Sequence, residues 1–269
     1  MNAKAILLII ATLAGLTTHS PASAWPGSDC KFTAERHAQA ALAGAKRITI
    51  RVGAGDLLVR GQKNGDGVSV HGKACAATAD LLKVTDVNVR REGEVVIISS
   101  VIPESPKPSV SILWTASNPY IDISIDLPQE LPITLEDSSG DILISNIAGG
   151  SIRDSSGDIQ VRGVSGNLDV MDSSGDIGID DVGGKLTLDD SSGDMNLRNI
   201  KGDVLVSSDS SGDIRVVNAG ANVSVESDSS GDLNVDGVAG NFTLGAKGSG
   251  DVNVHGVHGT VAIPDYKKN

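Results

Sequence analysis

A five-residue phrase, Asp-Ser-Ser-Gly-Asp, occurs six times between residues 137 and 232 of this 269-residue chain, and a shortened copy, Ser-Gly-Asp, follows at 249–251. The glycines of these seven turns lie 17 to 19 residues apart, at Gly140, Gly157, Gly175, Gly193, Gly212, Gly231 and Gly250. A repeat of this length cannot bury a core by itself, so successive repeats must stack to cover their apolar faces. The spacing therefore predicts a solenoid.

Apolar and polar residues alternate within each repeat, as in Ile159, Val161 and then Leu168, Val170. This period of two is typical of β-strands. A further apolar residue, Val164 in the same repeat, is expected to fill a corner of the coil. These features predict an all-β fold, a single-stranded β-solenoid of about 18–19 residues per coil.

Stacking should align equivalent apolar residues in internal columns, with about 4.8 Å between neighbouring strands. One predicted column consists of Ile142, Ile159, Ile177, Met195, Ile214, Leu233 and Val252. A second consists of Leu168, Leu186, Val204, Val223, Phe242 and Val261. A second turn is expected where glycine follows the corner residue, because glycine adopts backbone angles that other residues avoid. The second-turn glycines are Gly166, Gly184, Gly202, Gly240 and Gly259.

The chain divides into four parts. We expect a signal peptide at 1–24, an N-terminal cap with irregular β coils at 25–109, regular solenoid repeats at 110–263 and a polar tail at 264–269. Solenoids need caps that hide their open edges, and we assign Pro264 and the tail to this task at one end.

The N-terminal part is less regular. Thr33–Ala43 is rich in alanine with Glu, Arg and Gln, and Gly44 stands where a helix would stop, so a short capping helix is expected. Residues 55–59 echo the later repeats and predict an early coil. Residues 84–101 predict a hairpin with its turn at 91–93. Residues 103–108 contain three prolines and predict a loop.

The first residues have the pattern of an export signal. Lys4 precedes an apolar run from Ala5 to Leu16, and Ala22-Ser23-Ala24 forms a cleavage pattern of small residues. No later stretch is apolar for about 20 residues, so no transmembrane helix is expected. The sequence therefore predicts an exported protein, and it does not distinguish the periplasm from the cell surface or the exterior. No feature specifies an oligomeric state.

The chain has two cysteines, Cys30 and Cys75. Disulfides form in the compartments that exported proteins reach, so we expect these two residues to be joined. The alternative, a pair of metal-binding or redox thiols, lacks the usual spacing.

The acidic residues concentrate in the repeats. Residues 1–136 contain 13 acidic and 13 basic side chains, whereas residues 137–263 contain 20 and 7. Stacking should align the aspartates on each side of the Ser-Ser-Gly turn into two ladders, whose like charges repel. One interpretation is that turn amides donate hydrogen bonds to the carboxylates and that serine hydroxyls bridge adjacent coils.

The other interpretation is that calcium binds between carboxylates of successive turns, because hard cations prefer several oxygen ligands. Neither the nonapeptide calcium repeat nor the EF-hand loop is present. The candidate calcium ligands are Asp137, Asp141, Asp154, Asp158, Asp172, Asp176, Asp190, Asp194, Asp209, Asp213, Asp228 and Asp232.

A polysaccharide-active enzyme is a further alternative, because paired carboxylates such as Asp172 and Asp176 are the acid and base of glycoside hydrolysis. Here, however, the pair recurs in every repeat, whereas a catalytic centre is one irregularity in a scaffold. The chain also has only two each of Trp, Tyr and Phe. We therefore predict no enzyme, no catalytic residues and no cofactor apart from the calcium alternative. The net charge of −12 argues against nucleic acid as a partner.

Two further passages carry a resemblance. Residues 120–128 alternate up to a proline, and Leu131-Pro132-Ile133-Thr134-Leu135 leads into the repeated Ser-Ser-Gly-Asp-Ile. Over residues 46–263 the chain resembles the bacterial putative-adhesin family of β-strand-repeat proteins. The resemblance implies a β-solenoid in the bacterial envelope or at the cell surface, without established catalytic residues.

The expected function is therefore structural or adhesive rather than catalytic. Exposed positions on the flat strands would contact a long, repetitive partner, either a glycan or an envelope protein. These positions are Gln160, Arg162, Asn196, Arg198, Arg215, Asn234 and Asn253.

Overall fold

The computed structural model describes residues 30–42, 44–103 and 118–264. The predicted signal peptide, the proline-rich loop from residue 104 onward and the tail from residue 265 lie outside these residues. The chain separates into two units, Met1–Cys30 and Lys31–Asn269. The second unit is built almost entirely from strands, with one short helix, α1 (Ala79–Val84), among its described residues.

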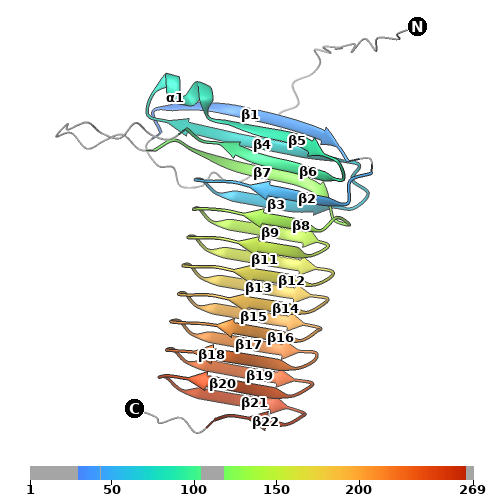
Figure 1. Ribbon diagram of the computed structural model, residues 1–269, viewed down its shortest axis with the longest axis vertical. Coiled ribbons are helices and arrows are strands. Elements are labelled where there is room, and N and C mark those ends of the chain that lie inside the picture. Colours follow the sequence, from blue (N-terminus) through green and yellow to red (C-terminus); the bar gives the residue numbers. More distant parts are fainter. Residues whose placement is uncertain (1–29, 43, 104–117, 265–269) are drawn as a thin grey trace, which may run out of the picture. The chain divides into compact units, whose positions relative to one another are not determined.

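Two sheets of 11 strands form the second unit (Figure 1). Sheet A contains, in spatial order, β1 (Phe32–Ala41), β4 (Gly67–Ala76), β7 (Tyr120–Pro128), β3 (Leu57–Gln62), β9 (Ile142–Ile147), β11 (Ile159–Val164), β13 (Ile177–Val182), β15 (Met195–Ile200), β17 (Ile214–Ala219), β19 (Leu233–Val238) and β21 (Val252–Val257). Sheet B contains β5 (Asp86–Glu92), β6 (Val95–Val101), β2 (Arg47–Arg51), β8 (Ile133–Glu136), β10 (Gly150–Arg153), β12 (Leu168–Met171), β14 (Leu186–Asp189), β16 (Val204–Ser208), β18 (Val223–Asp228), β20 (Phe242–Lys247) and β22 (Val261–Ala262).

From β8 onward, each coil contributes one strand to each sheet, and equivalent residues of successive coils pair in parallel register. Ile159 pairs with Ile142 on one side and Ile177 on the other. The predicted β-solenoid is therefore confirmed, and it has two sides. The change from 18 to 19 residues per coil appears as a local register shift, in which Leu188 pairs with Val206 but Asp189 pairs with Ser208.

The predicted apolar columns lie between the two sheets and form one continuous core. Side chains such as Ile159, Leu168 and Phe242 have no exposed surface. The columns weaken at the last coil, where Val252 is half-buried and Val261 is 50% exposed. The prediction that Val261 is internal is wrong, because β22 is the last strand of sheet B and no described strand lies beyond it.

The early coil predicted at residues 55–59 is present, but the order of coils in space differs from the order in the sequence. Strand β3 lies between β7 and β9, and β2 lies between β6 and β8. The chain therefore leaves after the β2–β3 coil, forms the cap and returns as β6 and β7 on the far side of that coil. The predicted hairpin is the antiparallel pair β5–β6.

The helix predicted over Thr33–Ala43 is wrong. Residues 33–41 lie in β1, which pairs antiparallel with β4 along its whole length, and residue 43 lies outside the described residues. One face of β1 is half-buried and the other exposed, as in a strand at the edge of a sheet. The Arg36 guanidinium anchors it by donating to the carbonyl of Leu82 in α1 (2.6 Å) and to that of Thr85 directly after α1 (2.8 Å). Pairing and anchoring override the helix propensity of alanine.

Both sets of glycines allow successive coils to stack closely, for different reasons. Gly193 has φ +133°, and a Cβ there would lie 1.9 Å from the carbonyl oxygen of Gly175 in the preceding coil. The second-turn glycines were predicted from backbone freedom, but residues such as Gly202 do not have positive φ. A Cβ on Gly202 would instead lie 2.6 Å from the backbone of Gly184. Close contact between coils, rather than an unusual backbone angle, favours glycine at the second turn, where one coil has Ala221 instead.

Candidate functional site

The two aspartates of each Asp-Ser-Ser-Gly-Asp turn have opposite environments. The first is buried and the second is exposed, with Asp209 at 0% exposure and Asp213 on the surface. We call the first set the buried ladder: Asp137, Asp154, Asp172, Asp190, Asp209 and Asp228. We call the second set the exposed ladder: Asp141, Asp158, Asp176, Asp194, Asp213, Asp232 and Asp251. The repeated phrase does not distinguish the two ladders, and this difference in burial separates their chemistry.

Each carboxylate of the buried ladder has one oxygen engaged with its own turn. In Asp172, Oδ1 accepts a hydrogen bond from the amide of Ser173 at 2.7 Å. The Oδ2 atoms of Asp137, Asp154, Asp172, Asp190 and Asp209 are buried and have no hydrogen-bond partner. Burial raises the pKa of these carboxyls, to about 7 for Asp137 and Asp209 and to about 6 for Asp190. The desolvated carboxylates resist ionisation.

A lysine continues the buried ladder in the seventh coil. Lys247 pairs with Asp228 in register, where the shortened phrase reads Lys-Gly-Ser-Gly-Asp. Its ammonium is fully buried and lies 3.2 Å from both carboxylate oxygens of Asp228. It also donates to the carbonyl of Gly231, at 2.6 Å, and to that of Ser249. The only sequence signal for this residue is its position in the seventh phrase, where Lys247 stands in place of the first aspartate.

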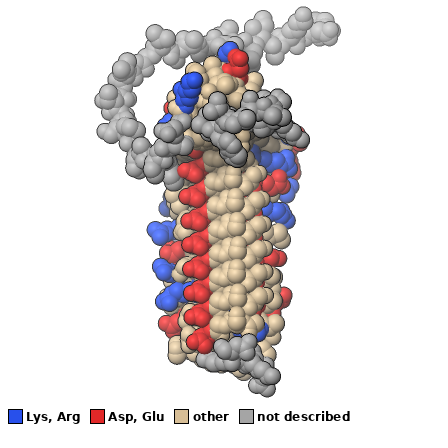
Figure 2. All heavy atoms as spheres, turned by 90° about the vertical axis from the view of Figure 1, so that its left-hand side faces the viewer, with Lys and Arg blue, Asp and Glu red and all other residues tan. Residues whose placement is uncertain are grey.

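The exposed ladder is held together by hydrogen bonds between coils. Oδ1 of each aspartate accepts from the backbone amide of its equivalent in the next coil, as between Asp176 and Asp194 at 2.9 Å. The same pattern continues to Asp56, just before β3, and to Asp122 in β7. Figure 2 shows the acidic side chains gathered in one straight column along the coils.

Serine hydroxyls also bridge adjacent coils, as from Ser192 to the carbonyl of Ser173 at 3.1 Å. The hydrogen bonds expected for the aspartates and serines are therefore present. Among the residues that the structure describes, no group of three or more His, Cys, Asp or Glu side chains is arranged to hold a metal ion. Calcium binding by the ladders stays a prediction.

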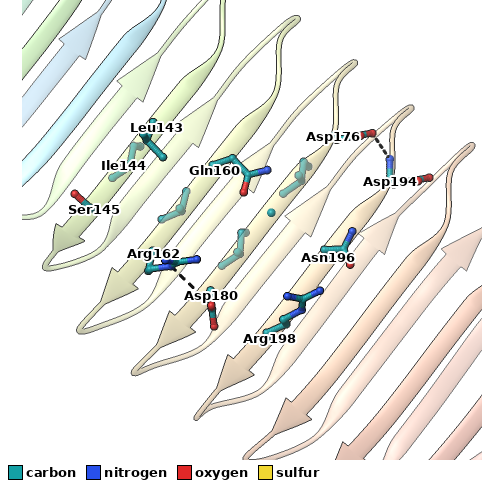
Figure 3. A pocket seen from close by; sticks show the side chains of 14 residues that line it. Leu143, Ile144, Ser145, Gln160, Arg162, Asp176, Asp180, Asp194, Asn196 and Arg198 are labelled. Atoms are coloured by element: carbon teal, nitrogen blue, oxygen red, sulfur yellow. Dashed lines mark hydrogen bonds and ion pairs between the residues drawn. The ribbon is translucent and has the colours of Figure 1, made fainter. Parts of the chain in front are cut away.

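A shallow hollow of about 550 Å³ lies on the outward face of sheet A, over β9 to β15 (Figure 3). It forms because Gly178 interrupts the outward column that runs from Leu143 through Gln160 to Asn196. A Cβ on Gly178 would lie 2.3 Å from Oε1 of Gln160, so the Gln160 amide lies over the glycine backbone. Four of the predicted contact residues line this hollow: Gln160, Arg162, Asn196 and Arg198.

Charged side chains line two edges of the hollow (Figure 3). Along one edge, Arg162 lies 3.8 Å from Asp180, and Asp180 Oδ1 accepts a hydrogen bond from Asn199 at 2.9 Å. Arg198 continues this edge and forms no ion pair with any described residue. The exposed ladder, at Asp176 and Asp194, forms the other edge. The hollow thus offers guanidinium, amide and carboxylate groups at strand spacing.

The other predicted contact residues, Arg215, Asn234 and Asn253, continue the outward column beyond the hollow. The amide of Asn253 donates to Oδ1 of Asn234 at 3.1 Å. The face that includes the hollow is therefore a ladder of planar polar side chains along successive coils.

Cys30 and Cys75 are both disulfide-bonded, and because the chain has no other cysteine, the predicted pair is confirmed. Two histidines that are far apart in the sequence meet in the cap. His37 and His71 face each other across β1 and β4, with their Nδ1 atoms 2.9 Å apart. No helix among the described residues is long and apolar enough to span a membrane.

The chain is similar to several solved structures of bacterial proteins. A putative adhesin from Bacteroides fragilis is 16% identical, with 86% of this chain and 97% of that chain covered and a TM-score of 0.49. A putative lipid binding protein from Parabacteroides distasonis is 17% identical, with 85% and 97% covered and a TM-score of 0.44. A putative cell adhesion protein from Clostridium sporogenes is 14% identical, with 86% and 99% covered and a TM-score of 0.29.

No curated protein matches the sequence. Residues 46–261 match the family described as Toastrack DUF4097. This span runs from the residue before β2 to the first residue of β22. The chain therefore belongs to the Toastrack DUF4097 family.

Proposed function

We propose that this chain is an exported, non-catalytic β-solenoid protein of the bacterial envelope that binds a glycan strand along the outward face of sheet A. The observation that carries the proposal is the hollow at Gly178, where planar polar side chains from successive coils surround an accessible stretch of strand. Gln160, Asn196 and Arg198 together supply amide and guanidinium donors and amide acceptors. Sugar hydroxyls, which both donate and accept hydrogen bonds, match this set.

A glycan fits this face better than a protein partner does. Protein interfaces are typically anchored by buried aromatic and apolar side chains at their centre. The exposed side chains of the hollow are polar except for Leu143 on its rim. The strand spacing of about 4.8 Å repeats the polar groups along the coils. A long polymer of similar units is able to contact several coils at once.

Export is supported by the disulfide between Cys30 and Cys75, because such bonds persist in oxidising compartments. The signal peptide predicted at residues 1–24 supports it independently. We assign the protein to the periplasm or the cell surface. Cell fractionation that finds an unprocessed chain in the cytoplasm contradicts this assignment.

The carboxylates of the hollow support binding rather than catalysis. Asp176 Oδ1 accepts a hydrogen bond from the backbone amide of Asp194, and Asp180 Oδ1 accepts one from the side-chain amide of Asn199. The first of these arrangements repeats in coil after coil, as a structural bond does. Reducing-end assays with envelope polysaccharides test this point directly, and release of shortened chains overturns the non-catalytic assignment.

Binding is tested by calorimetric titration of the purified protein with envelope polysaccharides and with protease-treated envelope extract. A Gly178→Gln variant fills the hollow and is expected to weaken glycan binding at least tenfold. The variant is expected to fold, because Gly178 does not have positive φ and the Gln160 amide in its way is flexible. Asn253→Gln, in the same outward column but outside the hollow, is the matched control.

The proposal is supported if a glycan binds and only the Gly178→Gln variant loses affinity. It is overturned if binding is lost when the extract is treated with protease, since the partner is then a protein. Equal affinity of the two variants also overturns it, because the hollow is then not the site.

A further inference from the structure

The buried ladder poses an electrostatic problem that the exposed ladder does not. Six carboxylates follow one another at strand spacing in the interior, and the Oδ2 atoms of the first five have no hydrogen-bond partner. Like charges at about 5 Å repel strongly where water is excluded. A buried carboxyl oxygen without a hydrogen-bond partner destabilises the folded state, whether the carboxyl is neutral or ionised.

The chain itself solves this problem at the last step. The Lys247 ammonium lies between Asp228 and the seventh turn, and its side chain is fully buried. Its oxygen partners are the Asp228 carboxylate and the carbonyls of Gly231 and Ser249. A singly charged cation enclosed by carboxylate and main-chain oxygens is thus part of the fold.

The same oxygens recur at the five steps above, without a lysine. For Asp190, the equivalent carbonyls belong to Gly193 and Ser211, and the Ser211 carbonyl also accepts the amide of Gly193 at 3.0 Å. Successive turn glycines approach one another to a similar distance at each step. A Cβ on Gly193, Gly212 or Gly250 would in each case lie 1.9 Å from the preceding glycine oxygen.

We propose that the buried ladder is a binding site for monovalent cations of ammonium size, such as potassium, held between successive coils by aspartate Oδ2 and main-chain carbonyl oxygens. Between the sixth and seventh turns, the ammonium group of Lys247 occupies the position of such a cation. Main-chain carbonyl oxygens replace the water shell of potassium elsewhere in proteins. Calcium takes six to eight oxygen ligands. Each step of the ladder offers a single unpartnered carboxylate oxygen, which suits a singly charged ion.

The test compares the melting temperature of the full, disulfide-bonded chain in potassium chloride and in tetramethylammonium chloride, at pH 8 and equal ionic strength. Tetramethylammonium has the same charge but is too large to occupy the position of a lysine ammonium. Each bound cation is expected to raise the melting temperature by roughly 3–6 °C per tenfold rise in potassium. Parallel samples contain calcium chloride or a chelator.

Matched variants locate the effect. Asp172→Asn, Asp190→Asn and Asp209→Asn together remove three charges from the buried ladder and are expected to abolish most of the potassium dependence. Asp176→Asn, Asp194→Asn and Asp213→Asn remove three charges from the same coils on the exposed ladder and are expected to retain it. If either variant fails to fold, the comparison on the unmodified chain still decides.

The proposal is overturned if the melting temperature is the same in potassium and tetramethylammonium. A response to calcium alone overturns it in favour of divalent ions. Potassium dependence that disappears only in the exposed-ladder variant overturns the location. Potassium dependence lost only in the buried-ladder variant supports it.

Discussion

The Nζ atom of Lys247 lies 3.2 Å from the carboxylate of Asp228, and neither side chain is exposed. This pair ends the buried ladder of six aspartates. The second aspartate of each turn belongs to the exposed ladder and lies on the surface. One five-residue phrase therefore builds two ladders of different character. The difference in burial between the two ladders and the close packing of the turns determine how the protein responds to substitution and to pH.

Replacing Lys247 with methionine leaves Asp228 as a buried carboxylate without its cation. Removing one partner of a buried ion pair typically costs about 3–5 kcal/mol. Urea denaturation followed by circular dichroism should show a loss of this size. Lys201→Met, at an exposed position of the same solenoid, is the control and should change stability by less than about 0.5 kcal/mol. Equal effects of the two variants contradict the role of the buried pair.

Stability should fall as the pH rises from about 4 to 7. Burial raises the pKa of Asp137 and Asp209 to about 7 and that of Asp190 to about 6, so the folded state binds protons that the unfolded state releases near its ordinary pKa of 3.8. The stabilising contribution is complete below pH 3.8 and is lost as the pH passes the folded pKa values. Urea midpoints measured across this range test the sign, and a steady rise in stability contradicts it.

An Asp190→Asn variant should reduce this pH dependence. Asparagine does not ionise, and its amide is able to donate to a neighbouring carboxyl oxygen in the ladder. The variant is therefore expected to gain stability relative to the unmodified protein at pH 8 and to lose that advantage at pH 4. A variant that is less stable than the unmodified protein at pH 8, where the carboxyl is ionised, shows that the ionised carboxylate is required.

Gly193→Ala should be among the most damaging single substitutions. Its φ of +133° disfavours any side chain, and the new Cβ would lie 1.9 Å from the Gly175 carbonyl oxygen. We expect a loss of more than about 3 kcal/mol in unfolding free energy. The control is Gly178→Ala, where only the movable Gln160 amide lies close, and a near-native melting temperature is expected. A mild effect at Gly193 indicates that the coils separate easily.

Reduction of the Cys30–Cys75 bond should destabilise the cap. Closing a loop of this length removes conformational freedom from the unfolded chain and is worth about 3–4 kcal/mol in the chain-entropy model. Calorimetry with and without reductant measures the effect. The double variant Cys30→Ser, Cys75→Ser is expected to melt at the temperature of the reduced protein and to be insensitive to reductant. A residual response of that variant attributes the effect to the reductant itself.

The regular coils were predictable because their signals are local and repeated. Ile159 and Val161 alternate within one strand, and the same alternation returns every 17 to 19 residues, so register follows directly from sequence. The cap was less predictable. Thr33–Ala43 favours a helix by composition, and only pairing with β4 makes its residues up to Ala41 a strand. The position of the β2–β3 coil between later coils has no local signature, because it depends on strands distant in the sequence.

The candidate site was predicted in part. The exposed residues Gln160, Arg162, Asn196 and Arg198 were expected to face a partner, and they line one hollow. That they form a hollow depends on Gly178, whose missing side chain matters only once strands β11, β13 and β15 lie side by side. The contact between His37 and His71 likewise required the antiparallel pairing of β1 with β4.

By itself, the sequence determined that this chain stacks short two-stranded coils, because an alternating apolar pattern at a constant interval leaves no other way to cover those side chains. Only the tertiary structure decided which aspartate of each turn faces inward and that Lys247 follows the last of them. That choice depends on how the turn closes over the core. Two identical carboxylates separated by three residues acquire different charge behaviour solely from the water that each one contacts.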